Sequence, residues 1–148
     1  MIQIEAQLPL PVDAALLETA AQQTLAYSQS APDLALTVVI GNDALLQANN
    51  LQFLGIDAPT DVLSFPAEYT DPDSHEQYLG DILISLPRAE QQAASGGHTL
   101  AEELQLLVVH GVLHLLGHDH AEVEQTQRMQ IAQDAVMNLL GSHNSPRL

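Results

Sequence analysis

The sequence predicts a single α+β domain in which a four-stranded mixed sheet packs with about five helices. Two observations favour this fold class. Segments that alternate apolar and polar residues, or that are rich in β-branched residues, lie among segments whose apolar residues recur at helical spacing. The 148 residues, of which 46% are hydrophobic, suit one globular unit with a sizeable core. We therefore expect residues 1–148 to form one domain.

Four segments are expected to form the strands of the sheet. The first segment alternates apolar and polar residues, with Ile2 and Ile4 on one side. The second segment is rich in β-branched residues and ends at Gly41. The third and fourth should stop at Pro66 and Pro87. A polar loop is expected between these two. The predicted strands are 2–8, 34–40, 60–65 and 79–85, and the predicted loop is 67–77.

Five segments are expected to form helices. The first follows two prolines and is amphipathic, Asn42 can cap the second, and Gly96 and Gly97 should end the third. The last carries apolar residues at helical spacing up to Gly141. The predicted helices are 12–28, 42–52, 87–95, 100–116 and about 121–140, and residues 142–148 should be a frayed tail.

The fourth predicted helix carries the clearest local signals. Thr99 and Glu102 fit the capping-box pattern, so the helix should begin at Leu100. From residue 104 onward it is apolar almost all round, which is typical of a buried helix. Gly117 can supply the left-handed residue that ends it.

The charge of the chain excludes several kinds of partner. Nineteen acidic residues face only three arginines and no lysine, which gives a net charge of −16. Binding of DNA or RNA through a basic patch is therefore not expected.

The N-terminus does not resemble a signal peptide, and no apolar run reaches the roughly 18 residues of a membrane span. We expect a cytoplasmic protein without a membrane partner. Because cysteine is absent, a metal must be held by histidine and carboxylate.

Residues 110–120, HGVLHLLGHDH, contain four histidines. His110 and His114 are four apart on the predicted helix, so both rings can reach one zinc ion at ~2.0–2.1 Å. His118 and His120 compete to be the third ligand. On a continued helix His118 would lie about 12 Å from His110, whereas a turn at Gly117 can bring His120 back over the pair. The predicted ligands are His110, His114 and His120.

Three neutral imidazoles leave the fourth position of a zinc ion to water, as in catalytic sites. A zinc ion can lower the pKa of that water to about 7 and can polarise a phosphoryl or carbonyl oxygen. We therefore expect one Zn²⁺ ion with a hydrolytic role. Histidine also suits other divalent transition metals such as Ni²⁺.

The spacing of the predicted ligands matches the H-E-x-x-H-x-x-G-x-x-H pattern of metzincin peptidases except at Gly111. Glutamate at that position is the general base of the peptidases, and glycine has no side chain for this work. The mismatch argues against a peptidase. We expect Gly111 to serve close packing of the helix on the sheet.

The stretch HGVLHLLGHDH resembles the H-G-x-L-H-L-x-G-x-D-H signature of the YbeY family of metal-dependent endoribonucleases, the rRNA maturation factors. The segments PTDVLSFP, LGDILIS and ELQLLVVHG resemble other shared parts of the family, so that the likeness spans about residues 50–140. It implies an α+β fold with a zinc-peptidase-like core. It also implies single-strand-specific RNA hydrolysis, maturation of the small-subunit rRNA 3′ end and ribosome quality control. The family's ligands carry over onto His110, His114 and His120.

Two positions depart from the family pattern. The family usually has Y-R-G before its P-T-D segment, with an arginine thought to hold RNA phosphate, and this chain has Leu54 there. His118 stands where tyrosine is frequent. Together with the net charge of −16, the first departure argues against efficient binding of free RNA. We therefore expect the protein to reach rRNA on the small subunit by docking on a basic ribosomal protein.

No catalytic residue is identified from the sequence. Asp119 could orient a ligand or act on the water, or it could stabilise a turn; Glu103 could line the cleft or be a solvated first-turn acid. Asp61 and Asp81 could face the site or cap strand ends, and Ser64 could meet a phosphate or be buried in the sheet. Two other functions stay open: a zinc metallopeptidase, and a non-catalytic ribosome assembly factor that zinc stabilises.

Overall fold

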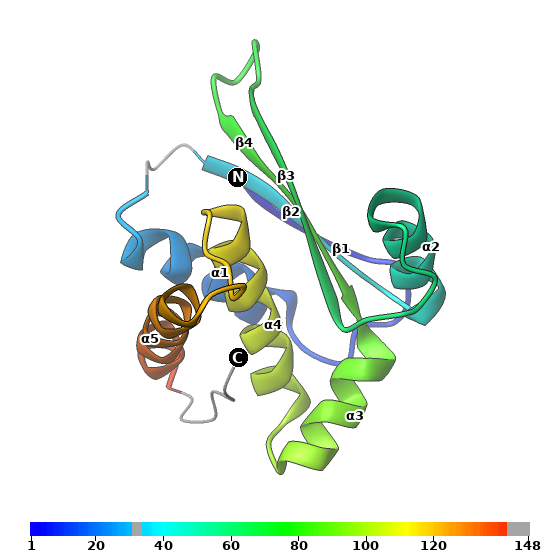
Figure 1. Cartoon of the computed structure of the whole chain (residues 1–148). Helices are drawn as coiled ribbons and strands as arrows, with labels where there is room; N and C mark the ends of the chain where they lie inside the picture. The colour runs from blue at the N-terminus through cyan, green and yellow to red at the C-terminus, as the bar shows by residue number, and fades with distance from the viewer. Residues whose placement is uncertain (31–33, 142–148) are drawn as a thin grey trace.

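The computed structural model of the chain describes residues 1–30 and 34–141. It contains a four-stranded sheet and five helices, as the sequence predicts (Figure 1). The elements run in the order β1 (Ile2–Ala6), α1 (Ala14–Tyr27), β2 (Leu34–Gly41), α2 (Asp43–Leu54), β3 (Val62–Thr70), β4 (Gln77–Ser85), α3 (Leu86–Gly96), α4 (Leu100–Leu115) and α5 (Val123–Leu139). The predicted tail, residues 142–148, lies outside the described residues.

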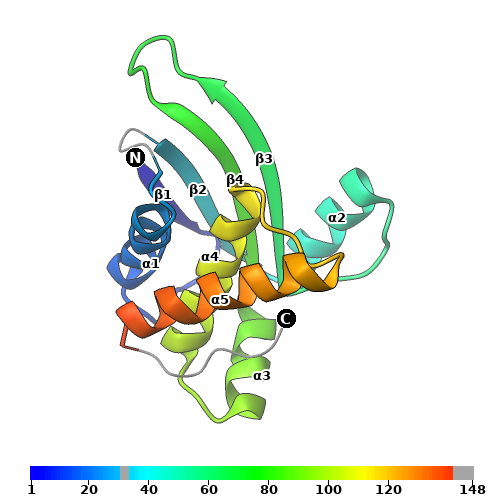
Figure 2. The same cartoon turned by 60° about the vertical axis from the view of Figure 1, so that its left-hand side comes forward.

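The sheet is mixed, with the strand order β1-β2-β4-β3. β2 pairs in parallel with both β1 and β4, while β3 pairs antiparallel with β4 at one edge. Helices α1, α4 and α5 gather on one side of the sheet and α2 lies on the other (Figures 1 and 2). The α+β fold class is confirmed.

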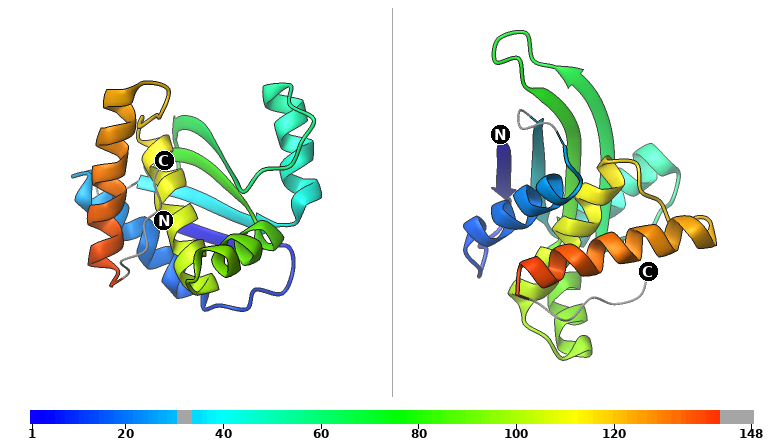
Figure 3. Two further views of the ribbon diagram at one scale, coloured as in Figure 1. Left: turned by 60° about the horizontal axis from the view of Figure 1, so that its bottom comes forward. Right: turned by 90° about the vertical axis from the view of Figure 1, so that its left-hand side faces the viewer.

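Helix α4 is the centre of the packing. It contacts the sheet through β3 and β4 and also contacts α1, α3 and α5, so that it lies between the sheet and the outer helices (Figure 3). Eleven of its 16 residues are buried. The predicted capping box is present, because Thr99 accepts from the Glu102 amide and Glu102 accepts from the Thr99 amide. The helix that carries two of the predicted ligands is therefore a fixed part of the core.

The largest error in the sequence prediction concerns the hairpin of β3 and β4. Pro66 was expected to end the third strand, but β3 continues to Thr70 and β4 begins at Gln77. Only the turn between them remains of the predicted loop at 67–77. A proline is tolerated because β3 is an edge strand and because the register of the pair shifts between Pro66 and Tyr69.

The helix boundaries differ little from the prediction. α1 and α5 each begin two residues later than expected. Asp13 caps α1 through a hydrogen bond from the Ala15 amide, and Asn42 caps α2 as predicted. Among the helices of the described part of the chain, none has the length and apolar character needed to cross a lipid bilayer.

Candidate metal centre

Three histidines from two segments meet at the C-terminal end of α4. His110 and His114 project from the same face of the helix, and their Nε2 atoms lie 3.1 Å apart. His120 comes from the segment that follows the helix. One ligand nitrogen from each of the three rings lies within 4.8 Å of the others. The structure therefore brings together the three histidines that the sequence singled out.

The turn after α4 explains how His120 reaches the pair. Gly117 has a φ of +97°, in the region that favours glycine, and its amide donates to the carbonyl of His114. The chain reverses there, and the ring centroid of His120 lies 5.2 Å from that of His114. His118, the competing ligand, does not belong to this cluster of described side chains.

The spacing of the rings fits a tetrahedral ion. Zinc–nitrogen bonds of about 2.05 Å in tetrahedral geometry separate the ligand nitrogens by roughly 3.3 Å. The His110–His114 separation of 3.1 Å is close to this value, and small side-chain rotations would bring His120 to it. His110, His114 and His120 could together hold one metal ion.

Burial keeps two of the three imidazoles in the form that binds metal. Burial lowers the pKa of His110, and burial together with the neighbouring rings of His110 and His120 lowers the pKa of His114 to about 4. Both rings are therefore neutral at pH 7. A neutral ring offers a lone pair to a cation, whereas a protonated ring would repel it.

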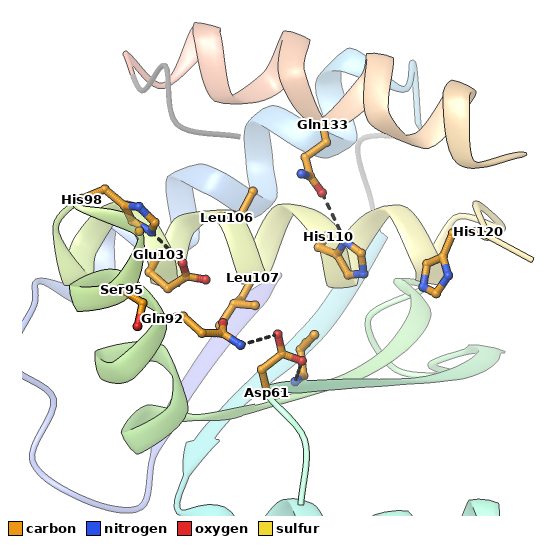
Figure 4. Close-up of a pocket in the computed structure, with 12 residues that line it drawn as sticks. Asp61, Gln92, Ser95, His98, Glu103, Leu106, Leu107, His110, His120 and Gln133 are labelled. Atoms are coloured by element: carbon orange, nitrogen blue, oxygen red, sulfur yellow. Dashed lines mark hydrogen bonds and ion pairs between the residues drawn. The ribbon is translucent and has the colours of Figure 1, made fainter. Parts of the chain in front are cut away.

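Gln133 orients the first histidine of the cluster. Its side-chain Oε1 lies 3.1 Å from Nδ1 of His110, so Nδ1–H donates to it and Nε2 is left facing the other rings (Figure 4). Gln133 is only 1% exposed. Sequence reasoning missed this residue. The available signal was a polar side chain inside the apolar stripe of α5, four residues after Met129.

Gly111 permits the close approach of α4 to the sheet, as predicted. A Cβ atom at this position would lie 2.7 Å from Cγ2 of Ile82 in β4. Ser64 of β3 also reaches this point, and its hydroxyl donates to the carbonyl of Gly111 at 3.2 Å. The place of the peptidase glutamate is therefore filled by the sheet.

Two hollows adjoin the three histidines. We name the first the groove: it has a volume of about 850 Å³ and runs from the end of α2 along β3 to the turn after α4. We name the second the inner cavity: it has a volume of about 460 Å³ and lies between α3, α4, α5 and the start of β3. Asp61, Val62, His110 and His120 line both hollows.

The weaker candidate residues take different places. Asp61 lines both hollows, caps the Val62 amide and accepts from Gln92. Asp81 lines neither and accepts from the Tyr78 hydroxyl. Ser64 and Asp119 line the groove, and the carboxylate of Asp119 accepts from the amide of His120, which is a turn-stabilising contact.

Glu103 is not a solvated acid. It is 4% exposed and is hydrogen-bonded to His98, whose Nε2 lies 2.7 Å from Oε1 of Glu103 (Figure 4). Burial raises the pKa of Glu103, and the hydrogen bond from His98 opposes this. Glu103 therefore lines the inner cavity, as one of the two sequence-based alternatives has it.

Comparisons with known proteins agree with the site. The sequence model of a family described as Endoribonuclease YbeY matches residues 3–141. A relative with that name from Chloroflexus aggregans is 44% identical over 138 residues, which cover 89% of this chain and 90% of the relative. Another relative, from Roseiflexus castenholzii, is 41% identical over 146 residues, which cover 95% of this chain and 91% of the relative. The solution structure of TM1509 from Thermotoga maritima is similar with a TM-score of 0.59 and 27% identity, over 94% of this chain and 91% of that one.

Proposed function

The chain belongs to the YbeY endoribonuclease family, and on this premise we propose that it is a metal-dependent endoribonuclease that acts in rRNA maturation. The observation that carries the proposal is the meeting of His110, His114 and His120 at the boundary between the groove and the inner cavity. The three rings are the proposed ligands of one ion, with zinc as the proposed metal and Ni²⁺ as an alternative.

When bound, a zinc ion would activate a water molecule and polarise a phosphoryl oxygen. The residues of the chain prepare the site for it. Gln133 holds the His110 ring with Nε2 toward the other two rings, and burial keeps His110 and His114 neutral. Neither Glu103 nor Asp119 is proposed as the general base, because the first is paired with His98 and the second stabilises the turn before His120.

The proposed substrate is single-stranded RNA, at the 3′ end of the small-subunit rRNA. The volume of the groove, about 850 Å³, supports binding of an extended strand, and unpaired nucleotides are the usual targets of RNA-binding proteins. We expect the protein to act in the cytoplasm, where ribosomes are assembled. The same family assignment supports a part in ribosome quality control.

We also propose that a basic ribosomal protein brings the enzyme to its RNA. The net charge of −16 repels free RNA but attracts a basic protein surface. Leu54, which is 57% exposed, lines the groove without offering a charge to phosphate. Titration with a basic and a neutral ribosomal protein should show preference for the basic one at low salt. Equal binding of both would contradict this part of the proposal.

The function is tested by measuring bound metal and RNA cleavage side by side for the wild type and His114→Ala. We expect one zinc ion per wild-type chain, cleavage of single-stranded RNA, and loss of both in the variant by at least about a hundredfold. His75→Ala, in the turn between β3 and β4, is the matched control and should keep both properties.

Three results would contradict the proposal in different ways. Full activity in His114→Ala would reveal a contaminating nuclease. Cleavage of peptides but not RNA would indicate a metallopeptidase, although Gly111 leaves no room for the glutamate of that class. Bound zinc that stabilises the wild type without any hydrolysis would indicate a non-catalytic assembly factor.

A further inference from the structure

The inner cavity is not needed to hold a metal ion, yet it opens directly beside His110 and His120 (Figure 4). Its volume of about 460 Å³ lies within the roughly 300–1,000 Å³ of small-molecule sites. It shares four lining residues with the groove. A strand that lies in the groove with a phosphate at the histidines can therefore direct a neighbouring base into the inner cavity.

The far end of the inner cavity is formed by the buried pair of His98 and Glu103. Their side chains are 7% and 5% exposed. The His98 ring packs over Gly96, where a Cβ atom would lie 2.5 Å from Cε1 of the ring. The absence of a side chain at Gly96 thus makes room for His98, and His98 in turn fixes the position of the Glu103 carboxylate.

One oxygen of that carboxylate remains available to a ligand. Oε1 of Glu103 accepts the hydrogen bond from His98. No group of the described residues donates to Oε2, which Figure 4 shows directed into the inner cavity. This oxygen is reached from the inner cavity, because no fully buried side-chain oxygen of the described residues lacks a hydrogen-bond partner. A carboxylate oxygen in such a place is a strong acceptor.

The hydrogen-bond groups of the lining are unequally used. The ring N–H of His98 donates to Glu103, and the side-chain amide of Gln92 donates to Asp61. The ring N–H of His110 donates to Gln133. The carboxylates of Glu103 and Asp61 therefore place acceptors at the far end and at the side of the inner cavity, while the hydroxyl of Ser95 can donate or accept. Val62, Leu106 and Leu107 supply apolar walls.

Resting on the proposed function, we propose that the inner cavity binds the nucleobase next to the scissile phosphate and prefers bases with an exocyclic amino group. Adenine, cytosine and guanine present such a group, whereas uracil presents two carbonyl oxygens beside a single N–H. The free oxygen of Glu103 accepts from the amino group, the apolar walls cover the faces of the ring, and uracil is disfavoured by its carbonyls. Glu103 is the specificity-determining residue.

The proposal is tested by binding, which does not require cleavage. The zinc-loaded protein is titrated with AMP, CMP, GMP and UMP, and the imidazole resonances of His98 are followed by NMR. We expect UMP to bind about tenfold more weakly than the other three, the difference expected for one hydrogen bond to a charged acceptor. Equal affinities for UMP and CMP would overturn the proposal.

The Glu103→Gln variant makes the test sharper. The glutamine oxygen can still accept from His98, and its NH₂ group would then face the inner cavity in place of an acceptor. The preference should disappear or reverse in favour of UMP, with zinc binding unchanged. Glu90→Gln, an exposed change on α3, is the matched control and should keep the wild-type preference. A preference for amino-bearing bases that survives in Glu103→Gln would contradict the assignment to Glu103.

Failure of the two proposals can be told apart. Discrimination among the nucleotides without RNA cleavage would leave the base site intact and refute the nuclease. If RNA is cleaved but uridine is as frequent as other bases on both sides of the cut, the nuclease proposal stands and the base-site proposal is refuted. This cleavage map needs only the wild type, so it decides the question even if Glu103→Gln does not fold.

Discussion

The two ends of α4 carry clusters of titratable groups that differ in one respect. At the N-terminal end, Glu103 and His98 form a pair in which a donor meets an acceptor. At the C-terminal end, the Nε2 atoms of His110 and His114 face each other, and no carboxylate of the described residues hydrogen-bonds a ring of the three histidines. In the first cluster the donor of His98 meets its acceptor within the chain. The second gathers one ligand nitrogen from each of three rings within 4.8 Å of one another, an arrangement that suits a cation, which is why we assign it to a metal.

The largest difference between the two ends should appear when zinc is added. Zinc at a thousandfold excess over its dissociation constant should stabilise the folded wild type by about 4 kcal/mol. His110→Ala removes one ligand and should abolish this gain. The unfolding midpoint in denaturant, measured with and without zinc, checks the prediction. An equal gain in the variant would mean that zinc binds elsewhere.

Breaking the other end should cost stability without affecting the metal. Glu103→Ala leaves the His98 donor buried and unpaired, which should lower the free energy of unfolding by about 2–3 kcal/mol. The stabilisation by zinc should be unchanged. Chemical denaturation of the variant and of Glu90→Ala, whose exposed side chain should contribute within about 0.5 kcal/mol, provides the comparison. Loss of zinc binding in Glu103→Ala would show that the two ends are coupled.

Acidification should act on the two ends with opposite sign. The pKa of His114 is about 4 in the folded chain against 6.5 ordinarily, so the unfolded state binds more protons between these values and stability falls as the pH falls. For the metal-free protein the loss from His114 should be about 1 kcal/mol between pH 6.5 and 5.5. The pKa of Glu103 is raised, so the folded state binds more protons than the unfolded state. Its contribution to stability is therefore full at pH values below the ordinary pKa of the carboxyl group, and it is lost as the pH rises through the pKa of the folded state. Denaturation of the metal-free wild type and of His114→Gln at several pH values measures the first effect, which the variant should lack.

The smallest effect concerns the groove rather than α4 itself. Leu54→Arg places a charge where the family usually has one and should strengthen binding of single-stranded RNA a few-fold at low salt. The slope of log affinity against log salt should steepen by about 0.7 for one added phosphate contact. Leu51→Arg, on the same helix and outside the groove, is the matched control for net charge. Equal gains in both variants would show that only the overall charge matters.

Local sequence patterns made most of the fold and the cluster of three histidines predictable. The capping box of Thr99 and Glu102 fixes the start of α4, and the i, i+4 spacing of His110 and His114 fixes their common face. The turn at Gly117 then restricts where His120 can go. Each of these inferences depends on residues that are close in the sequence.

What the sequence did not reveal depends on contacts between distant residues. Gln133 reaches His110 only because α5 packs on α4, and Gln92 reaches Asp61 only because α3 lies beside the start of β3. The pairing of His98 with Glu103 was missed for another reason: an acid in a first helical turn usually faces water. The hairpin beyond Pro66 was missed because the strand order, which places β3 at the edge, cannot be read from its own residues.

The edge position of β3 has a consequence for the molecule in solution. An open strand edge presents unpaired backbone groups onto which another polypeptide can add, and this is a common route to aggregation. Pro66 and the shifted register beside it interrupt the regular row of groups along this edge. A foreign strand would find no continuous template there, which disfavours self-association along the wall of the groove.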